Sequence, residues 1–216
     1  MKILHHDSSI VVVDKPAELS VLAEGWNKEM PYLAKMLEEQ FGKVWVVHRL
    51  DKGTSGVMVF ALTAEAHRSL NIQFERHEVE KAYHAIMNGI PNWDEKVTKF
   101  PLRVNVGHKH RTVVDDRSGV PAETRFRLLE RYQAAALVEA SPMTGRTHQI
   151  RAHAYALGYP LVGDILYSAP ENNLIARPAL HARSLTLTHP ENGKRLTFQA
   201  DYPNDLLNAI NLLRGK

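Results

Sequence analysis

The stretch Val44–Thr63, VWVVHRLDKGTSGVMVFALT, decides the fold of this chain. Two apolar runs, Val44–Val47 and Val57–Leu62, flank a polar segment, KGTSG, that is typical of a loop. We therefore expect a strand, an exposed loop and a second strand. Asp51 lies at the mouth of the loop beside Arg49, where two anchored strands would hold its carboxylate in place. A catalytic acid needs such fixed geometry.

Outward from this unit, short valine-rich or alternating runs predict strands and amphipathic runs predict helices. The other expected strands are 10–13, 81–87, 97–102, 123–129, 136–140, 180–188 and 195–200. The expected helices are 31–41, ended by Gly42; 64–76, capped by Thr63; one that carries Ile150, Ala154 and Leu157, capped by Thr144 or Thr147; and 203–213.

This strand-rich, mixed pattern predicts an α+β fold. We expect one domain, residues 1–216, built on a mixed, mainly antiparallel β-sheet flanked by helices and loops. The sequence contains no internal repeat, low-complexity tract or obvious linker.

The composition is that of an ordinary globular protein, with 44% hydrophobic and 24% charged residues among 216. Lysine and arginine outnumber the acids by 27 to 24, a balance that suits a polyanionic partner but does not establish one. The chain has no cysteine, which excludes disulfides, thiolate metal sites and cysteine nucleophiles. No signal peptide or membrane-spanning segment is recognisable, so we expect a cytoplasmic protein with no membrane association.

The most basic window is Arg103–Arg111, RVNVGHKHR. It contains almost no acid to balance its cations, which are Arg103, His108, Lys109, His110 and Arg111. Taken alone, the window favours a solvated loop over an arm that contacts phosphates.

Several common catalytic sites do not fit. The histidines do not form HExxH, and His148 and His153 are five residues apart, which turns them away from a shared ligand face on a helix. The sequence has no GxSxG elbow and no phosphate-binding glycine loop. For Asp51 alone, an ion pair with Arg49 or a turn-capping role is the commoner alternative to catalysis.

Three segments together resemble the pseudouridine synthases of the RluA type, which modify uridines in tRNA and ribosomal RNA. They are the HRLDKGTSG loop, the KAYHA segment around Tyr83, and GRTHQIR. Further similar segments occur in the family's order: ILHHDSSIVVVDKPAELSV near the N-terminus and LHARSLTLTHP near the C-terminus. One departure is Ala17-Glu18, where many members carry Pro-Gly or Ala-Gly.

The resemblance implies a role for each matching residue. Asp51 would be the catalytic carboxylate, Tyr83 the active-site aromatic and Arg151 the basic partner of the aspartate. Arg49 would help to eject the target base or fill the space it leaves. Residues that would bind substrate with Arg49 are Lys52, Thr54, Arg146 and His148. Structural alternatives stay open: Tyr83 as a core aromatic, Arg151 as a surface or phosphate contact, Thr54 as a turn residue and His148 as a hydrogen-bonded histidine.

The implied reaction breaks the bond between uracil N1 and ribose C1′, turns the base and joins C1′ to C5. It needs no redox cofactor and no metal. The implied partner is a structured RNA, such as a tRNA or rRNA stem-loop, whose target uridine is flipped into a central active-site cleft. The family likeness begins almost at the first residue, so we expect no N-terminal S4 RNA-binding domain, and we expect a monomer.

Two other functions are compatible with parts of the sequence. One is a catalytically inactive RNA-binding protein on the same fold. The other is a hydrolase that uses paired carboxylates, for which the candidate second acid is Asp164, in the longer arginine segment SPMTGRTHQIRAHAYALGYPLVGDILYS. We interpret Asp164 as structural instead.

Overall fold

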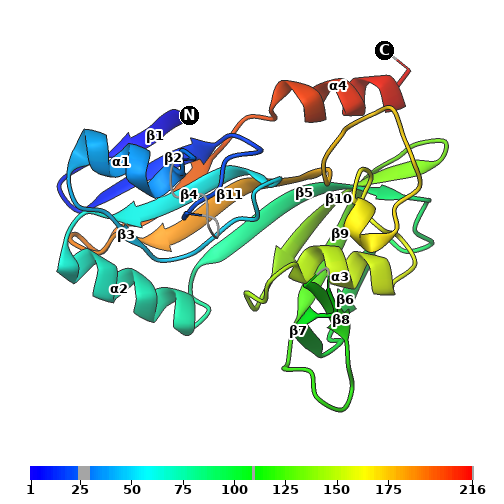
Figure 1. The fold of residues 1–216 in the computed structure, drawn as a ribbon, viewed down its shortest axis with the longest axis horizontal. Coiled ribbons are helices and arrows are strands. Elements are labelled where there is room, and N and C mark those ends of the chain that lie inside the picture. Colours follow the sequence, from blue (N-terminus) through cyan, green and yellow to red (C-terminus); the bar gives the residue numbers. More distant parts are fainter. Residues whose placement is uncertain (24–29, 109, 216) are drawn as a thin grey trace. The chain divides into compact units, whose positions relative to one another are not determined.

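A computed structural model describes residues 1–23, 30–108 and 110–215. The chain forms two compact units, one of residues 1–81 and 182–201 and the other of residues 82–181 and 202–216. It passes between them within strands β5 (Glu80–Asn88) and β11 (Leu180–Thr188). Figure 1 shows the helices and strands of both units, and each unit has a hydrophobic cluster of its own.

The strands of the first unit pair in antiparallel fashion, and β4 takes the central place among them. β4 pairs with β2 and with the short β3, while β1 pairs with β2 and β12 pairs with β11. The bounds are β1 Lys2–His6, β2 Ile10–Lys15, β3 Trp45–Val46, β4 Ser55–Ala61 and β12 Arg195–Gln199.

Every residue of β4 is buried. A strand with neighbours on both edges and side chains packed on both faces has this continuous apolar character. The predicted strands at 10–13 and 57–62 are confirmed. Of the strand predicted over 44–47, only Trp45 and Val46 join the ladder.

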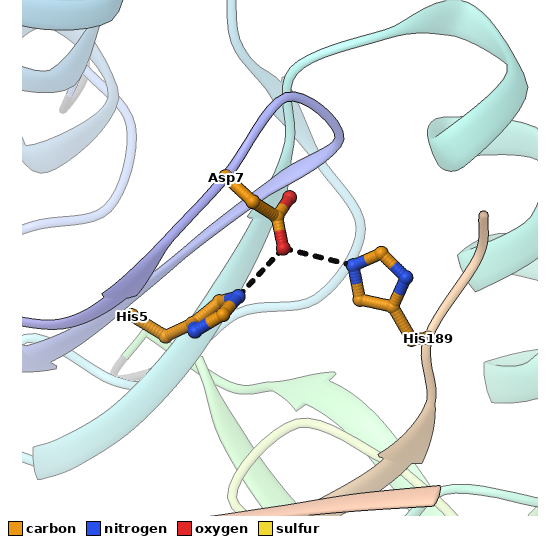
Figure 2. Close-up of side chains that lie close together, drawn as sticks. All are labelled: His5, Asp7 and His189. Carbon is orange, nitrogen blue, oxygen red and sulfur yellow. Dashed lines mark hydrogen bonds and ion pairs between the residues drawn. The ribbon is translucent and has the colours of Figure 1, made fainter. Parts of the chain in front are cut away.

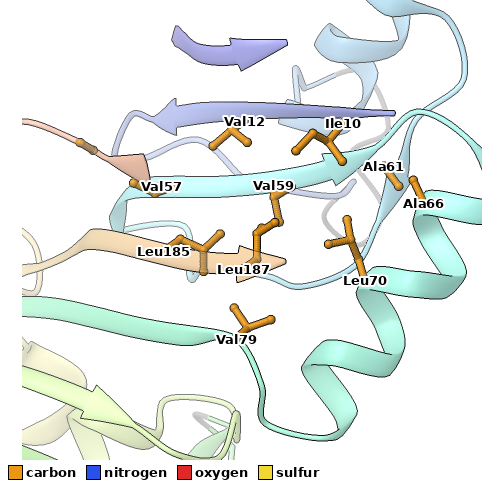
Figure 3. Close-up of a cluster of buried hydrophobic side chains, with 11 residues drawn as sticks. Ile10, Val12, Val57, Val59, Ala61, Ala66, Leu70, Val79, Leu185 and Leu187 are labelled. Carbon is orange, nitrogen blue, oxygen red and sulfur yellow. The ribbon is translucent and has the colours of Figure 1, made fainter. Parts of the chain in front are cut away.

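Helix α2 (Ala64–Glu75) completes the core of the first unit (Figure 3). Its buried Leu70 packs in one cluster with Val59 of β4 and Leu187 of β11. Full burial of a leucine contributes roughly 1.5–3 kcal/mol. The predicted cap is confirmed, because the Thr63 side chain accepts a hydrogen bond from the Ala66 N–H. Helix α1 spans Leu33–Phe41 and ends at Gly42, as predicted, although it begins two residues later than expected.

The second unit holds the antiparallel order β5-β10-β9-β6 and a separate β7-β8 hairpin. Its helices are α3, the short 3-10 helix η1 and α4. The bounds are β6 Glu95–Thr98, β7 Leu102–Val106, β8 Arg111–Val114, β9 Thr124–Arg131, β10 Ala135–Pro142, α3 Gln149–Ala156, η1 Ile165–Tyr167 and α4 Asn204–Leu213.

Successive side chains of β5 and β10 pack toward different helices. Ala85 and Met87 of β5 pack in the cluster that contains Ile150 of α3, whereas Ile86 packs in the cluster that contains Leu206 of α4. Successive residues of a strand point to opposite faces, so the sequence AIM is sufficient to build both contacts. The two faces are therefore covered by helices from distant parts of the chain.

Three local predictions in this unit are wrong. The strand predicted over 97–102 is interrupted, since Pro101 has no N–H to donate to a ladder. The window Arg103–Arg111, for which a solvated loop was favoured, lies mostly in the β7-β8 hairpin, although most of its described residues are exposed. Helix α3 begins after His148, and neither Thr144 nor Thr147 caps it.

The expected α+β class with a mainly antiparallel sheet is confirmed by the strand pairings and helices of both units. Across the described ranges, the helices are all too short or too polar to traverse a lipid bilayer.

Candidate active site

Asp51 opens a tight turn in the loop between β3 and β4. The Thr54 N–H donates a hydrogen bond to the Asp51 carbonyl oxygen at 2.9 Å. Leu50 is buried, whereas Arg49 is exposed and Asp51 is half-buried. The chain thus points alternately into and out of the core on its way to the turn. Asp51 is thus half-buried at the start of the turn, directly after the buried Leu50.

A buried ammonium group holds the main chain directly after the aspartate. Lys15 has no exposed surface, and its Nζ donates to the carbonyl oxygens of Pro16 (2.9 Å), Leu19 (2.8 Å) and Lys52 (3.1 Å). The Glu18 N–H donates to the same Lys52 oxygen at 2.8 Å. Since charge-assisted hydrogen bonds are strong, the two loops are tied together at the candidate catalytic residue.

Glu18 belongs to the departure from the family pattern, and it adopts a backbone conformation that glycine favours. Its φ is 62°, in the left-handed region where glycine is favoured. A glycine at this position would place its N–H toward Lys52 without steric cost. In this chain a non-glycine residue holds the same backbone conformation.

The end of the loop is packed closely into the first unit. Thr54 and Ser55 are buried. Gly56 has a φ of 115°, and a Cβ added there would overlap the carbonyl oxygen of Ala182 in β11. Burial gives Thr54 a packing role, and its predicted contact with substrate stays a prediction.

His48, three residues before Asp51, anchors the beginning of the loop. Its Nε2 accepts a hydrogen bond from the Val59 N–H of β4 at 3.1 Å. Its ring stacks on Phe74 of α2, with centroids 4.7 Å apart and an interplanar angle of 23°. Sequence reasoning assigned no role to His48, although it is the first residue of the HRLD motif.

Tyr83 is half-buried in β5, opposite Ala140 of β10. It packs against the cluster that includes Ile150 of α3 and Phe126 of β9. The ring is therefore partly a core aromatic, which was the alternative to a catalytic role for Tyr83. Its predicted stacking on a uracil would use the remaining accessible part.

Arg151 and Asp164 form a buried bidentate ion pair. Arg151 Nε lies 2.6 Å from Asp164 Oδ2 and Nη2 lies 2.8 Å from Oδ1. The side chains are 8% and 1% exposed. The structural interpretation of Asp164 fits this contact. Because both carboxylate oxygens are engaged and inaccessible, Asp164 is poorly suited to serve as the second acid of a hydrolase.

Tyr167 extends this pair into a network that sequence reasoning missed. The Arg151 guanidinium lies 5.2 Å from the centre of the Tyr167 ring. The Tyr167 hydroxyl accepts from the Thr112 N–H and donates to the Thr112 carbonyl oxygen, both at 3.0 Å. Burial raises the pKa of Tyr167, so the hydroxyl remains protonated and able to donate. The only sequence signal was an aromatic three residues after Asp164.

The predicted binding residues Arg146 and His148 lie at the start of α3. Arg146 is exposed, and its main-chain N–H donates to Gln149 Oε1 at 3.0 Å. His148 adopts a left-handed φ of 52° and places Nδ1 3.4 Å from the Tyr167 hydroxyl. The conformation of this segment is thus set by side chains, and the Arg146 guanidinium stands at the surface.

Within the basic window, Arg103 forms an ion pair with Asp115 at 2.6 Å. The Arg111 guanidinium lies 5.3 Å from the ring centre of Tyr155 and 5.1 Å from that of Tyr167. Lys109 lies outside the described residues. These two arginines therefore contact other side chains of the same protein, which argues against a wholly solvated loop.

The candidate residues fall into two sets. The first unit contains Arg49, Asp51, Lys52 and Thr54, and the second contains Tyr83, Arg146, His148 and Arg151. The residues of the first set are neighbours in one loop, whereas in the second set Arg146, His148 and Arg151 lie in or just before α3 and Tyr83 lies in β5. The joint action of Asp51 with Tyr83 and Arg151 stays a prediction.

In the part of the chain that the structure describes, His5, Asp7 and His189 of the first unit place potential metal-ligand atoms within 4.8 Å of one another (Figure 2). Asp7 Oδ2 lies 2.6 Å from His5 Nε2 and 2.9 Å from His189 Nε2. The N–H groups of Glu191 and Asn192 donate to His189 Nδ1 at 3.3 Å, which places the ring proton on Nε2. A bound metal would displace that proton to Nδ1, against two donors. The group therefore fits a hydrogen-bonded clasp better than a metal site.

A family model described as RNA pseudouridylate synthase matches residues 9–156. Ribosomal large subunit pseudouridine synthase D of Neisseria meningitidis serogroup A is 36% identical over 99% of this chain, which spans 61% of that relative's length. Dual-specificity RNA pseudouridine synthase RluA of Escherichia coli K12 is 38% identical, over 92% of this chain and 91% of the relative. The solved structure of human RNA Pseudouridylate Synthase Domain Containing 4 matches with a TM-score of 0.80 and 28% identity, over 99% of this chain and 93% of that one.

Proposed function

The chain belongs to the RNA pseudouridylate synthase family, and we propose from this membership that it isomerises uridine to pseudouridine in a structured RNA. The observation that carries the proposal is the anchoring of Asp51. Its turn is tied through Lys52 to the buried Lys15, and Asp51 itself is half-buried. This is the arrangement that a reactive carboxylate needs.

In the proposed mechanism, Asp51 either attacks ribose C1′ or removes a proton from C2′ while the bond to uracil N1 breaks. The base turns, and C1′ joins C5 while the bond from Asp51 to C1′ breaks or, on the other route, while a proton returns to C2′. N1 gains a proton from solvent and C5 loses its own. Tyr83 stacks on the uracil, and its hydroxyl assists the departure of the C5 proton. The cation of Arg151, oriented by Asp164, favours the ionised form of the Asp51 carboxylate.

The proposed substrate is a stem-loop of tRNA or ribosomal RNA, with its target uridine flipped out of the stack. Arg49 would occupy the space that the base leaves, and further contacts would come from Lys52, Thr54, Arg146 and His148. The reaction conserves atoms and electrons, so we assign it neither cofactor nor metal. We propose that the chain works as one catalytic domain, as a monomer in the cytoplasm.

A tritium-release assay tests this proposal. The substrates are unmodified transcripts of the source organism's tRNAs and large-subunit rRNA, labelled with [5-³H]uridine. Each turnover releases tritium to water, because C5 exchanges its hydrogen for the bond to C1′. Replacement of the catalytic carboxylate, Asp51→Asn, should lower kcat by at least about 10⁴-fold.

The matched control is Asp201→Asn, an aspartate in the same unit whose side chain is 86% exposed. It should leave the rate unchanged. RNA binding by the unsubstituted protein without tritium release from any transcript would overturn the proposal and support the inactive RNA-binding alternative.

A further inference from the structure

We propose that His48 is the positioning residue for Asp51. Its side chain accepts the next hydrogen bond from β4 in place of the main chain, so that the main chain can leave the sheet and form the catalytic turn. This inference rests on the proposed function of Asp51. His48 does not touch the reacting atoms in this account. It acts by fixing the path of the main chain over the next three residues, Arg49, Leu50 and Asp51.

The register of β3 on β4 shows the substitution. Trp45 pairs with Ala61 and Val46 pairs with Phe60 in antiparallel fashion. The next pair in this ladder would join Val47 to Val59, but β3 ends at Val46. The Val59 N–H instead donates to the imidazole Nε2 of His48 at 3.1 Å. A side chain thus satisfies a strand N–H that the departing main chain leaves behind.

The ring suits this role in shape and in charge. It stacks on Phe74, which fixes the plane of the imidazole, and Nε2 accepts from the Val59 N–H. Since Nε2 accepts a hydrogen bond, the ring proton resides on Nδ1. Burial, reinforced by the charge of Lys81, lowers the pKa of His48 to about 3. The imidazole is therefore neutral, and its acceptor is preserved, throughout the pH range in which RNA is stable.

The position of His48 affects Asp51 because the residues between them point alternately out of the core and into it. With His48 held against β4, Arg49 is exposed, Leu50 is buried and Asp51 begins the turn closed by the Thr54 N–H. The His48 contact follows directly on the last β3–β4 pair, Val46 with Phe60, and so holds the chain to β4 at the point where it leaves the ladder. A displacement of about 1 Å at a reacting group can lower a rate by about 10²-fold.

Two substitutions test the hydrogen-bond acceptor of His48 and its aromatic ring separately. His48→Gln places an amide oxygen near the position of Nε2 and keeps an acceptor for Val59. His48→Phe keeps the ring on Phe74 and removes the acceptor. We expect the phenylalanine variant to lose about 10²-fold in kcat for tritium release, with little change in KM, and the glutamine variant to stay within about threefold of the unsubstituted protein.

The pH profile tests positioning against direct catalysis. A positioning role predicts that kcat between pH 5.5 and 9 has the same acidic limb in the unsubstituted protein and in His48→Gln. Loss of that limb, or a glutamine variant as slow as the phenylalanine variant, would show that His48 exchanges protons in the reaction and would overturn the inference. Equal kcat in all three proteins would overturn it as well.

A second measurement does not depend on catalysis. Amide hydrogen exchange at Val59, followed by NMR, should be slow in the unsubstituted protein and in His48→Gln, and at least tenfold faster in His48→Phe. If no protein releases tritium, the proposed function fails while this anchor is still measured. If the unsubstituted protein is active and Val59 is equally protected in all three, the inference about His48 fails alone.

Discussion

Asp51 and Arg151 are held in opposite ways. The loop of Asp51 is held by main-chain hydrogen bonds and by the buried Lys15 ammonium, and Asp51 itself is half-buried. Arg151 is buried and locked by its own head group, through a bidentate pair with Asp164. A group that must react is best anchored through its neighbours, whereas a group that supplies charge and shape can be anchored directly. The two residues should therefore respond differently to substitution.

The largest expected effect is the loss of rate in Asp51→Asn, at least about 10⁴-fold in single-turnover tritium release. Its free energy of unfolding, measured with urea, should change by less than about 1 kcal/mol, because the loop is anchored elsewhere. A strong destabilisation of this variant would remove the contrast with Arg151.

The next effect is on stability. Asp164→Asn leaves the buried Arg151 cation without its charge partner, and we expect a loss of about 3–5 kcal/mol in the free energy of unfolding. Urea denaturation followed by circular dichroism measures this loss.

The matched control is the double variant Arg151→Met with Asp164→Leu, which removes both charges and fills similar volume. It should recover most of the stability, since the uncompensated charge is gone. It should not recover tritium release. Full activity in the double variant would contradict the assigned role of Arg151.

A smaller effect concerns the clasp of Figure 2, which joins the turn after β1 to the turn after β11. Burial alone would raise the pKa of Asp7. Hydrogen bonds from His5, the N–H groups of Ser9 and Ile10, and His189 together hold the pKa well below its usual value. A depressed pKa in the folded state stabilises the protein above the unfolded-state value near 3.8, and this contribution is lost as the pH falls through the folded-state value.

Asp7→Asn tests that clasp, because an amide oxygen can still accept from Ser9 and Ile10 while the oxygen that faces the histidines is lost. We expect a loss of about 1–2 kcal/mol at pH 7. Unfolding curves between pH 7 and pH 2 should show a constant difference between the two proteins above the unfolded-state value near 3.8 and a shrinking difference as the pH falls below it. A difference that stays constant over the whole range would contradict the assignment.

The smallest expected effect is a gain. Glu18→Gly relieves a left-handed backbone next to the Lys52 anchor and should stabilise the protein by up to about 1 kcal/mol. Ala17→Gly, a neighbour without positive φ, should destabilise it slightly, because glycine adds freedom to the unfolded chain. Thermal unfolding of both variants, with opposite shifts, measures the difference.

Sequence reasoning succeeded where the signal is local. The alternation in β5, the Thr63 cap and the Gly42 helix end all follow from neighbours in the chain, and the structure confirms them. The HRLD and GRTHQIR segments indicated the family, which the comparisons support. The errors at Pro101 and at the start of α3 arose where short runs or competing side chains decide the outcome.

Thus the sequence alone determined the α+β class, the positions of most strands and helices, and the family, because periodicity and motif spacing are properties of adjacent residues. Only the tertiary structure decided that Asp164 locks Arg151, that Asp7 meets His189 across 182 positions, and that His48 accepts from Val59. These partners are joined by packing and long-range hydrogen bonds, and no local pattern in the chain specifies which donor will meet which acceptor.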